Sequence, residues 1–121
     1  MAASTKPDAP LVLVKWYDYA KWVLERVESF PKNQRYVLGQ RLSHQVMEVV
    51  ELLVEASYSR EKRDLLATVT RKMEAVRWTV RMSKDRNLLS ASQFTHSARC
   101  LNECGKMVGG WWKAEGKKKV P

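Results

Sequence analysis

Apolar side chains recur along four segments of the chain at alternating spacings of three and four residues. This spacing places them on one face of an α-helix, and such a face packs against a core. It predicts helices over residues 11–30, 33–57, 61–84 and 91–114. No segment shows the period of two that a half-buried β-strand requires. We therefore predict an all-α fold.

The apolar positions of the four segments form the predicted core. They are Trp16, Ala20, Val23, Val27 and Phe30 on the first helix; Leu42, Val46, Val49, Leu53 and Ala56 on the second; Leu66, Val69, Met73, Val76 and Val80 on the third; and Phe94, Ala98, Leu101, Gly105, Val108 and Trp112 on the fourth. Four helices of this length joined by short loops predict an up-down-up-down antiparallel four-helix bundle.

Local residues indicate where the helices begin and end. Pro31 is expected to end the first helix, and the polar turn KDRN at residues 84–87 the third. Ser90 or Ser92 can cap the fourth. The expected organisation is a flexible tail over residues 1–10, a bundle over 11–115 and a basic disordered tail over 116–121.

The last predicted helix carries a second apolar stripe, formed by Cys100, Cys104, Met107 and Trp111. One stripe per helix is enough for a bundle, so the second predicts contact with another copy of the chain. Cys104, Met107 and Trp111 are then the candidate oligomer interface. The alternative is a wide stripe that packs within the core of the monomer.

The stretch CGKMVGGWWK at residues 104–113 combines a helical apolar pattern with three glycines and two adjacent tryptophans. Gly105 and Gly109 lie on nearly one face and would let another helix come close. Adjacent tryptophans point about 100° apart on a helix. We expect Trp112 to fill the core and Trp111 to meet another subunit.

Charge is distributed unevenly along the chain, whose net charge is +9. Residues 9–31 and 32–59 are each neutral. Residues 60–86 carry nine basic and four acidic side chains, and residues 87–121 carry six basic and two acidic ones. The whole excess therefore lies in the second half, which favours a polyanionic partner.

Basic residues follow one edge of the third predicted helix. Arg71 lies on its outer face beside Trp78, whose ring could stack on a base. Such an edge binds phosphates without reading base sequence. The alternative is a solvated face whose arginines pair with Glu48, Glu51 and Glu55. The residues of the basic edge are Arg60, Arg63, Arg77, Arg81 and Lys84.

Motifs of catalysis are absent from the sequence: it holds no P-loop, nucleophile elbow or HExxH pair. We expect a protein that is not an enzyme and that needs no cofactor. His96, Cys100 and Cys104 recur at intervals of four residues and are of ligand type, but small apolar packing explains the cysteines better. We expect no bound metal.

The sequence contains no apolar run of about 18 residues and begins without the apolar core of a signal peptide. We therefore expect a cytoplasmic protein without a membrane partner. A peripheral binder of anionic membranes would also use the basic charges, but it would want exposed apolar residues beside them.

Three stretches, FPKNQRYVLGQRL, EAVRWTVRM and LNECGKMVGGWWK, occur in this order. Together they resemble the accessory variability determinant (Avd) proteins of diversity-generating retroelements. The similarity spans roughly residues 12–115, and its most specific part runs from Gly105 to Trp111. A related four-helix family, encoded in intervening sequences of bacterial 23S ribosomal RNA genes, shares the FPK opening but normally lacks this ending.

The resemblance implies a basic protein that assembles into pentameric rings and binds RNA and DNA without clear sequence specificity. It implies association with an error-prone reverse transcriptase and with template-repeat RNA during mutagenic retrohoming, in a bacterial, archaeal or phage-encoded system. Arg77 and Arg81 match basic positions of the family, and Lys106 falls where an arginine is common. The rival interpretation is a nucleic-acid-binding relative of the intervening-sequence proteins, with no polymerase partner.

Overall fold

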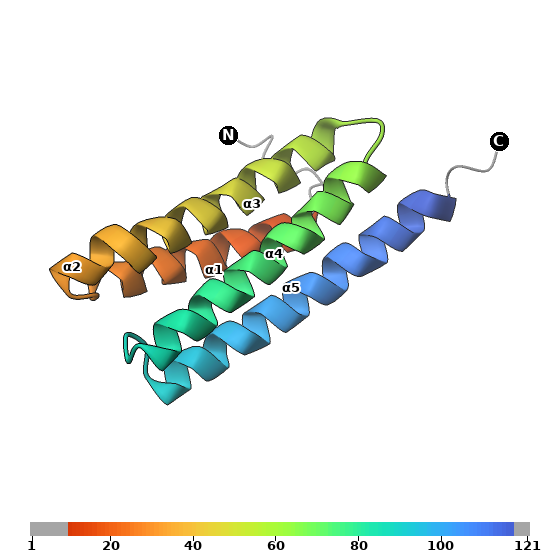
Figure 1. Ribbon diagram of the computed structural model, residues 1–121. Helices are drawn as coiled ribbons and strands as arrows, with labels where there is room; N and C mark the ends of the chain where they lie inside the picture. Colours follow the sequence, from red (N-terminus) through yellow and green to blue (C-terminus); the bar gives the residue numbers. More distant parts are fainter. Residues whose placement is uncertain (1–9, 118–121) are drawn as a thin grey trace.

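The protein is a bundle of four long helices in which each helix runs antiparallel to the one before it (Figure 1). The computed structural model describes residues 10–117. The long helices are α1 (Leu11–Glu28), α3 (Gln40–Tyr58), α4 (Arg63–Asp85) and α5 (Ala91–Lys117). No strand occurs in this part of the chain. The predicted all-α, up-down-up-down architecture is confirmed.

The connection between α1 and α3 is a tight reversal. α1 ends shortly before Pro31, as predicted, and the chain continues through a short helix α2 (Lys32–Gln34) and a π-helical turn η2 (Arg35–Gly39). The expected uniform helix over 33–57 therefore begins with a widened turn. Gly39 lies against α1 here, because a Cβ at this position would come within 2.8 Å of Val27 Cγ1.

The connection between α4 and α5 joins two capping motifs. The amide groups of Asn87 and Leu88 donate hydrogen bonds to the carbonyl oxygens of Lys84 and Ser83, at 2.9 Å each. Asn87 adopts the left-handed conformation that this helix ending needs, with φ of 64°. Ser90 then caps α5, because its hydroxyl accepts from the Gln93 amide while the Gln93 side chain accepts from the Ser90 amide. The predicted cap at Ser90 is confirmed.

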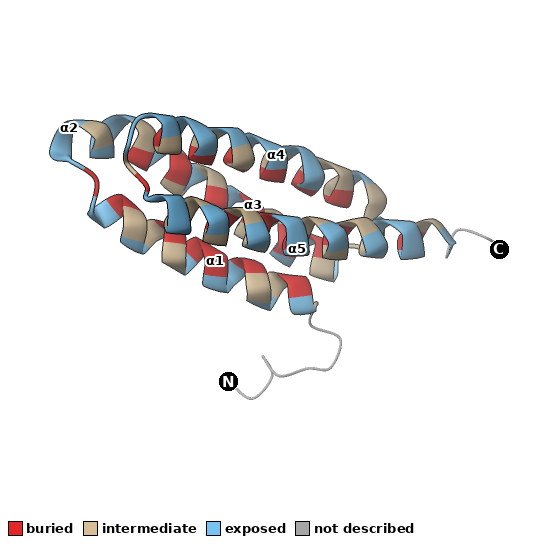
Figure 2. Cartoon of the chain, turned by 90° about the horizontal axis from the view of Figure 1, so that it is seen from below, coloured by how far each residue is buried: buried red, intermediate tan, exposed pale blue. Residues whose placement is uncertain are grey.

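The predicted core residues of the first three long helices are all buried (Figure 2). Trp16 is fully buried, and its indole Nε1 donates a 2.9 Å hydrogen bond to the Val46 carbonyl on α3. The indole N–H therefore has a partner in the middle of the core, as a buried tryptophan requires.

The inward face of α5 differs from the prediction. Its buried residues are Ser97, Leu101, Cys104, Val108 and Glu115. Trp112 is 37% exposed, so its predicted place in the core is wrong. Cys104 is 1% exposed and lies in the core of the monomer, so it is not available to another subunit.

Large side chains of α1 explain why α5 turns a different side toward the core than predicted. Tyr19 and Trp22 project from α1 toward α5, where the Tyr19 hydroxyl and the Ser97 hydroxyl lie 2.6 Å apart. The Trp22 ring lies 4.7 Å from the His96 ring. Two small side chains of α5, Ser97 and Cys104, therefore face α1. The apolar spacing of the sequence predicts larger residues at this contact.

The rest of the second stripe also serves the monomer. Met107 and Trp111 are partly buried against the core, as the wide-stripe alternative expected. A Cβ at Gly105, Gly109 or Gly110 would meet nothing within 4 Å. These glycines therefore do not bring two helices of the monomer together.

Residues 1–9 and 118–121 lie outside the described part of the chain. They include the expected N-terminal tail except Pro10, and the end of the expected basic tail. α5 continues through Lys117, so the helix extends past the predicted boundary at residue 116.

Candidate nucleic-acid interface

Three residues of the basic edge, Arg63, Arg77 and Arg81, lie on the side of α4 that is next to α5. Arg77 and Arg81 line the same groove between the two helices. Each pairs with an acid of its own helix: Arg77 Nε lies 3.2 Å from Glu74, and Arg81 Nε lies 3.3 Å from Asp85. Both pairs are at the surface, where an ion pair contributes about 0–1 kcal/mol, so a phosphate can replace the carboxylate at little cost.

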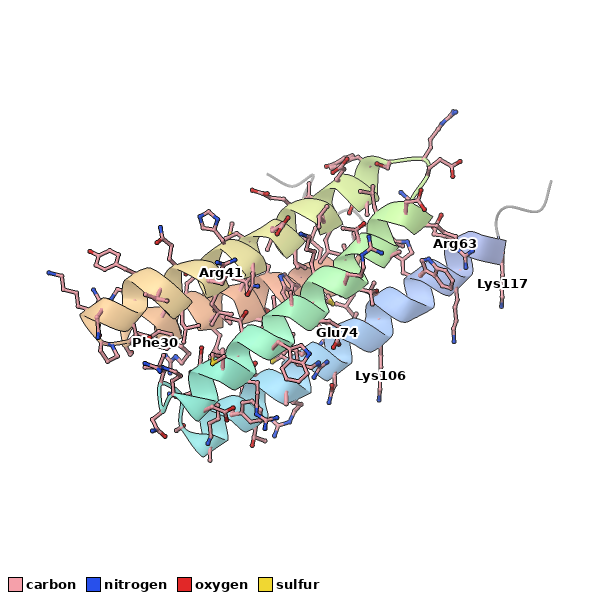
Figure 3. All side chains as sticks on the ribbon, viewed as in Figure 1. Phe30, Arg41, Arg63, Glu74, Lys106 and Lys117 are labelled. Carbon is pink, nitrogen blue, oxygen red and sulfur yellow. The ribbon has the colours of Figure 1, made fainter. Side chains whose placement is uncertain are left out.

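Arg63 occupies the other end of α4, beside the last turns of α5 (Figure 3). Its guanidinium carbon lies 3.6 Å from the centre of the Trp112 ring, and its Nε donates a 3.2 Å hydrogen bond to the Trp112 carbonyl. Gly116 leaves room for this contact, because a Cβ there would come 2.6 Å from Arg63 Nη2. Arg63 therefore joins α4 to α5 as well as adding charge to the surface.

The remaining predicted contacts of the third helix are spread around it. Arg60 is exposed in the loop before α4, and Lys84 is half-buried near the end of α4. Arg71 is exposed on the outer face and donates a 3.0 Å hydrogen bond to the Thr68 hydroxyl. The acids of α3 were the alternative partners for the arginines, but Glu48 pairs instead with Lys72, at 3.2 Å.

A second row of basic residues lies on α5, of which only Lys106 was expected from the sequence. Arg99, Lys106, Lys113 and Lys117 are exposed on the outer side of the helix; we call them the α5 ridge. Lys106 and Lys117 point away from the bundle in the same direction (Figure 3). The sevenfold spacing of Arg99, Lys106 and Lys113 is the signal that would have revealed the ridge.

The α5 ridge and the basic edge lie on neighbouring helices and flank the groove between them. With Arg71 they form what we call the basic face. The other side of the bundle, built from α1 and α3, derives from the two neutral segments of the sequence. The charge asymmetry along the chain is therefore an asymmetry between two sides of the molecule.

The two cysteines have the environment of packing residues. Burial raises the pKa of the Cys104 thiol to about 12 and also raises the pKa of the Cys100 thiol. Cys100 Sγ lies 3.5 Å from His96 Nε2. Both thiols stay protonated at neutral pH, and a protonated thiol is a poor metal ligand and nucleophile. Within residues 10–117, no three histidine, cysteine or acidic side chains gather as metal ligands would.

Comparison with protein families matched residues 11–115 to the bAvd-like family model. The chain belongs to the bAvd-like family. Comparisons with curated proteins and with solved structures gave no significant match. The match covers α1, α3 and α4 entirely and nearly all of α5, so the basic face of this bAvd-like protein, apart from Lys117, lies within the matched region.

A search of the described helices for one able to cross a lipid bilayer found none.

Proposed function

We propose that this bAvd-like protein is a non-enzymatic accessory protein of a diversity-generating retroelement. It binds RNA and DNA through the basic face and associates with the error-prone reverse transcriptase during mutagenic retrohoming. The observation that carries the nucleic-acid part is that two neighbouring helices, α4 and α5, each expose a row of basic side chains. The retroelement and polymerase parts rest on the membership of the bAvd-like family.

The basic face suits phosphates and not base edges. Arginine and lysine neutralise backbone charge and release counterions whatever the sequence, which gives affinity without specificity. The two rows of basic residues also follow long helices. Because α4 spans 23 residues and α5 spans 27, their contacts can follow several consecutive phosphates.

The proposal includes a homo-oligomer, most simply the pentamer implied by the resemblance to Avd proteins. We assign its interface to the side away from α5, because most exposed large apolar side chains lie on α1, η2 and α3. A ring built through that neutral side would leave every basic face free, and several weak contacts to one strand then combine into avidity. The apolar residues concerned are Leu11, Val14, Tyr17, Tyr36, Val37, Met47, Val54 and Tyr58.

The nucleic-acid part is tested with the double variant Arg77→Ala/Arg81→Ala and with a matched control, Lys21→Ala/Arg41→Ala, which removes two exposed charges from the other side. Log affinity for RNA or DNA should fall linearly with log salt, by about 0.9 per contacted phosphate on duplex DNA and about 0.7 on single strands. The first variant should bind more weakly and with a shallower slope, while the control should match the parent. Equal binding by both variants, or an affinity that does not change with salt, would contradict the proposal.

The polymerase part needs a separate measurement. A reverse-transcriptase gene beside the gene for this protein, and capture of that enzyme by the purified protein, would support it. If the protein binds nucleic acid but captures no reverse transcriptase, the relative of the 23S intervening-sequence proteins becomes the better description.

A further inference from the structure

A small cavity opens between α4 and α5, toward the end of the basic face where the two helices are joined. Its volume is about 160 Å³. Phe94, Ala98 and Leu101 of α5 supply an apolar wall, and Trp78 of α4 stands at its side. Arg77 and Arg81 lie at the same opening.

The size and lining of this cavity fit one flat ring. An apolar cavity of about 150 Å³ accommodates a molecule the size of benzene. A nucleobase presents an aromatic face of comparable kind, and aromatic side chains stack on any of the bases. The two guanidinium groups at the opening are suited to the phosphates on either side of such a base.

Trp78 is placed to act on a ligand. Its side chain is 67% exposed, although tryptophan is strongly apolar, and it lies between the two arginines in sequence and on the outer side of the groove. The ring therefore contributes little to the core of the protein. It is available to cover a base that enters the cavity.

We propose that this cavity receives one unpaired base of a single-stranded RNA or DNA, which stacks on Trp78 while Arg77 and Arg81 hold the neighbouring phosphates. This inference rests on the proposed function and adds a preference to it: single strands over duplexes. A duplex keeps its bases stacked on one another, so they reach the cavity only after a costly unstacking step.

The lining also predicts that base identity is not read. Apart from the arginines and the indole N–H of Trp78, Ser97 supplies the polar group of the cavity, and its hydroxyl is already bonded to the Tyr19 hydroxyl at 2.6 Å. We therefore expect no base to be selected by hydrogen bonds to its edge, so that any preference among bases comes from ring size and stacking.

The experiment compares three probes of about 12 nucleotides: a single strand with bases, an abasic single strand with the same backbone, and a duplex. The parent should bind the base-bearing strand about ten-fold or more tightly than the abasic strand, the size of one stacking contact. Trp78→Ala should lose that advantage and keep the affinity for the abasic strand, whereas Trp78→Phe should retain most of it. Ala98→Leu, which fills the cavity and leaves Trp78 in place, should also lose it.

Tyr58→Ala is the matched control, because it removes an aromatic side chain that is 81% exposed at the end of α3, far from the cavity along the bundle. Thermal melting of each variant shows whether the fold is intact. If Trp78→Ala weakens all three probes equally, or none of them, the stacking proposal is wrong while the basic face stands. Loss of polymerase capture by Trp78→Ala with unchanged nucleic-acid affinity would likewise overturn it and assign the cavity to a protein partner. Failure of the parent to bind any probe would reject the proposed function itself.

Discussion

Trp16 and Trp112 show how differently two side chains of one kind are used in this bundle. Trp16 is fully buried and bonded to the Val46 carbonyl, whereas Trp112 is 37% exposed and stacks on Arg63. The sequence predicts the first correctly, because Trp16 continues the regular apolar spacing of Ala20, Val23 and Val27 on α1. It misplaces the second, because a count of apolar residues on α5 cannot detect that the contact of Tyr19 with Ser97 fixes which side of α5 faces the core.

The energetic consequence is a contrast between two truncations. Trp112→Ala should lower the free energy of unfolding by about 1 kcal/mol, the scale of an exposed cation–π contact. Trp16→Ala should lower it by about 3–5 kcal/mol through the cavity that it leaves. Urea unfolding measures both. A double-mutant cycle of Trp112→Ala with Arg63→Ala isolates the stacking energy, and additive effects would mean that the pair does not interact.

Among the elements, α5 is the one whose orientation the sequence leaves open. Its two apolar stripes permit two rotations, and the contacts of Ser97 and His96 with α1 select one of them. On the other long helices every residue of the predicted stripe is buried, so their predicted cores are correct. The sequence therefore predicts which segments are helical better than which residues of α5 face inward. The same rotation decides which basic residues of α5 reach the surface.

The glycines of the helices should respond to alanine in opposite ways. At Gly105 and Gly109 an added Cβ meets nothing within 4 Å, so each alanine should stabilise the fold by about 0.5–1 kcal/mol through helix propensity. At Gly39 the Cβ would come 2.8 Å from Val27 Cγ1, so alanine should destabilise by about 1–3 kcal/mol. Thermal melting compares the three variants. A destabilised Gly105→Ala or Gly109→Ala with a lowered oligomer mass would place these glycines at a subunit contact.

At the scale of the whole molecule, two unlike sides coexist in one bundle. The second half of the sequence carries all the excess charge, and α4 and α5 are neighbours in space, so this asymmetry could be anticipated from composition alone. The exposed apolar residues of α1 and α3 could not, because a helical stripe count does not show which apolar side chains remain outside the core.

We expect a closed oligomer assembled through the neutral side, with a mass near five times 14.0 kDa by light scattering. Met47→Glu/Val54→Glu should reduce that mass and leave the helical content unchanged, because both side chains are exposed, at 42% and 40%. Met82→Glu, on the outer face of α4, is the control and should keep the parent mass. A parent protein that is monomeric at micromolar concentration would rule out the assembly.

The bond between Tyr19 and Ser97 joins residues 78 positions apart, whereas most helix contacts in the bundle join consecutive segments. This difference bears on the order in which the structure forms. Helical hairpins close short loops and pay little entropy, so chains built from them fold within microseconds to milliseconds. The contact between α1 and α5 closes the longest loop of the chain. Its entropic cost is therefore highest before the helical hairpins have formed. Loss of the Ser97 hydroxyl should therefore accelerate unfolding and leave the folding rate nearly unchanged. The buried pair thus prolongs the lifetime of the native state by slowing its unfolding.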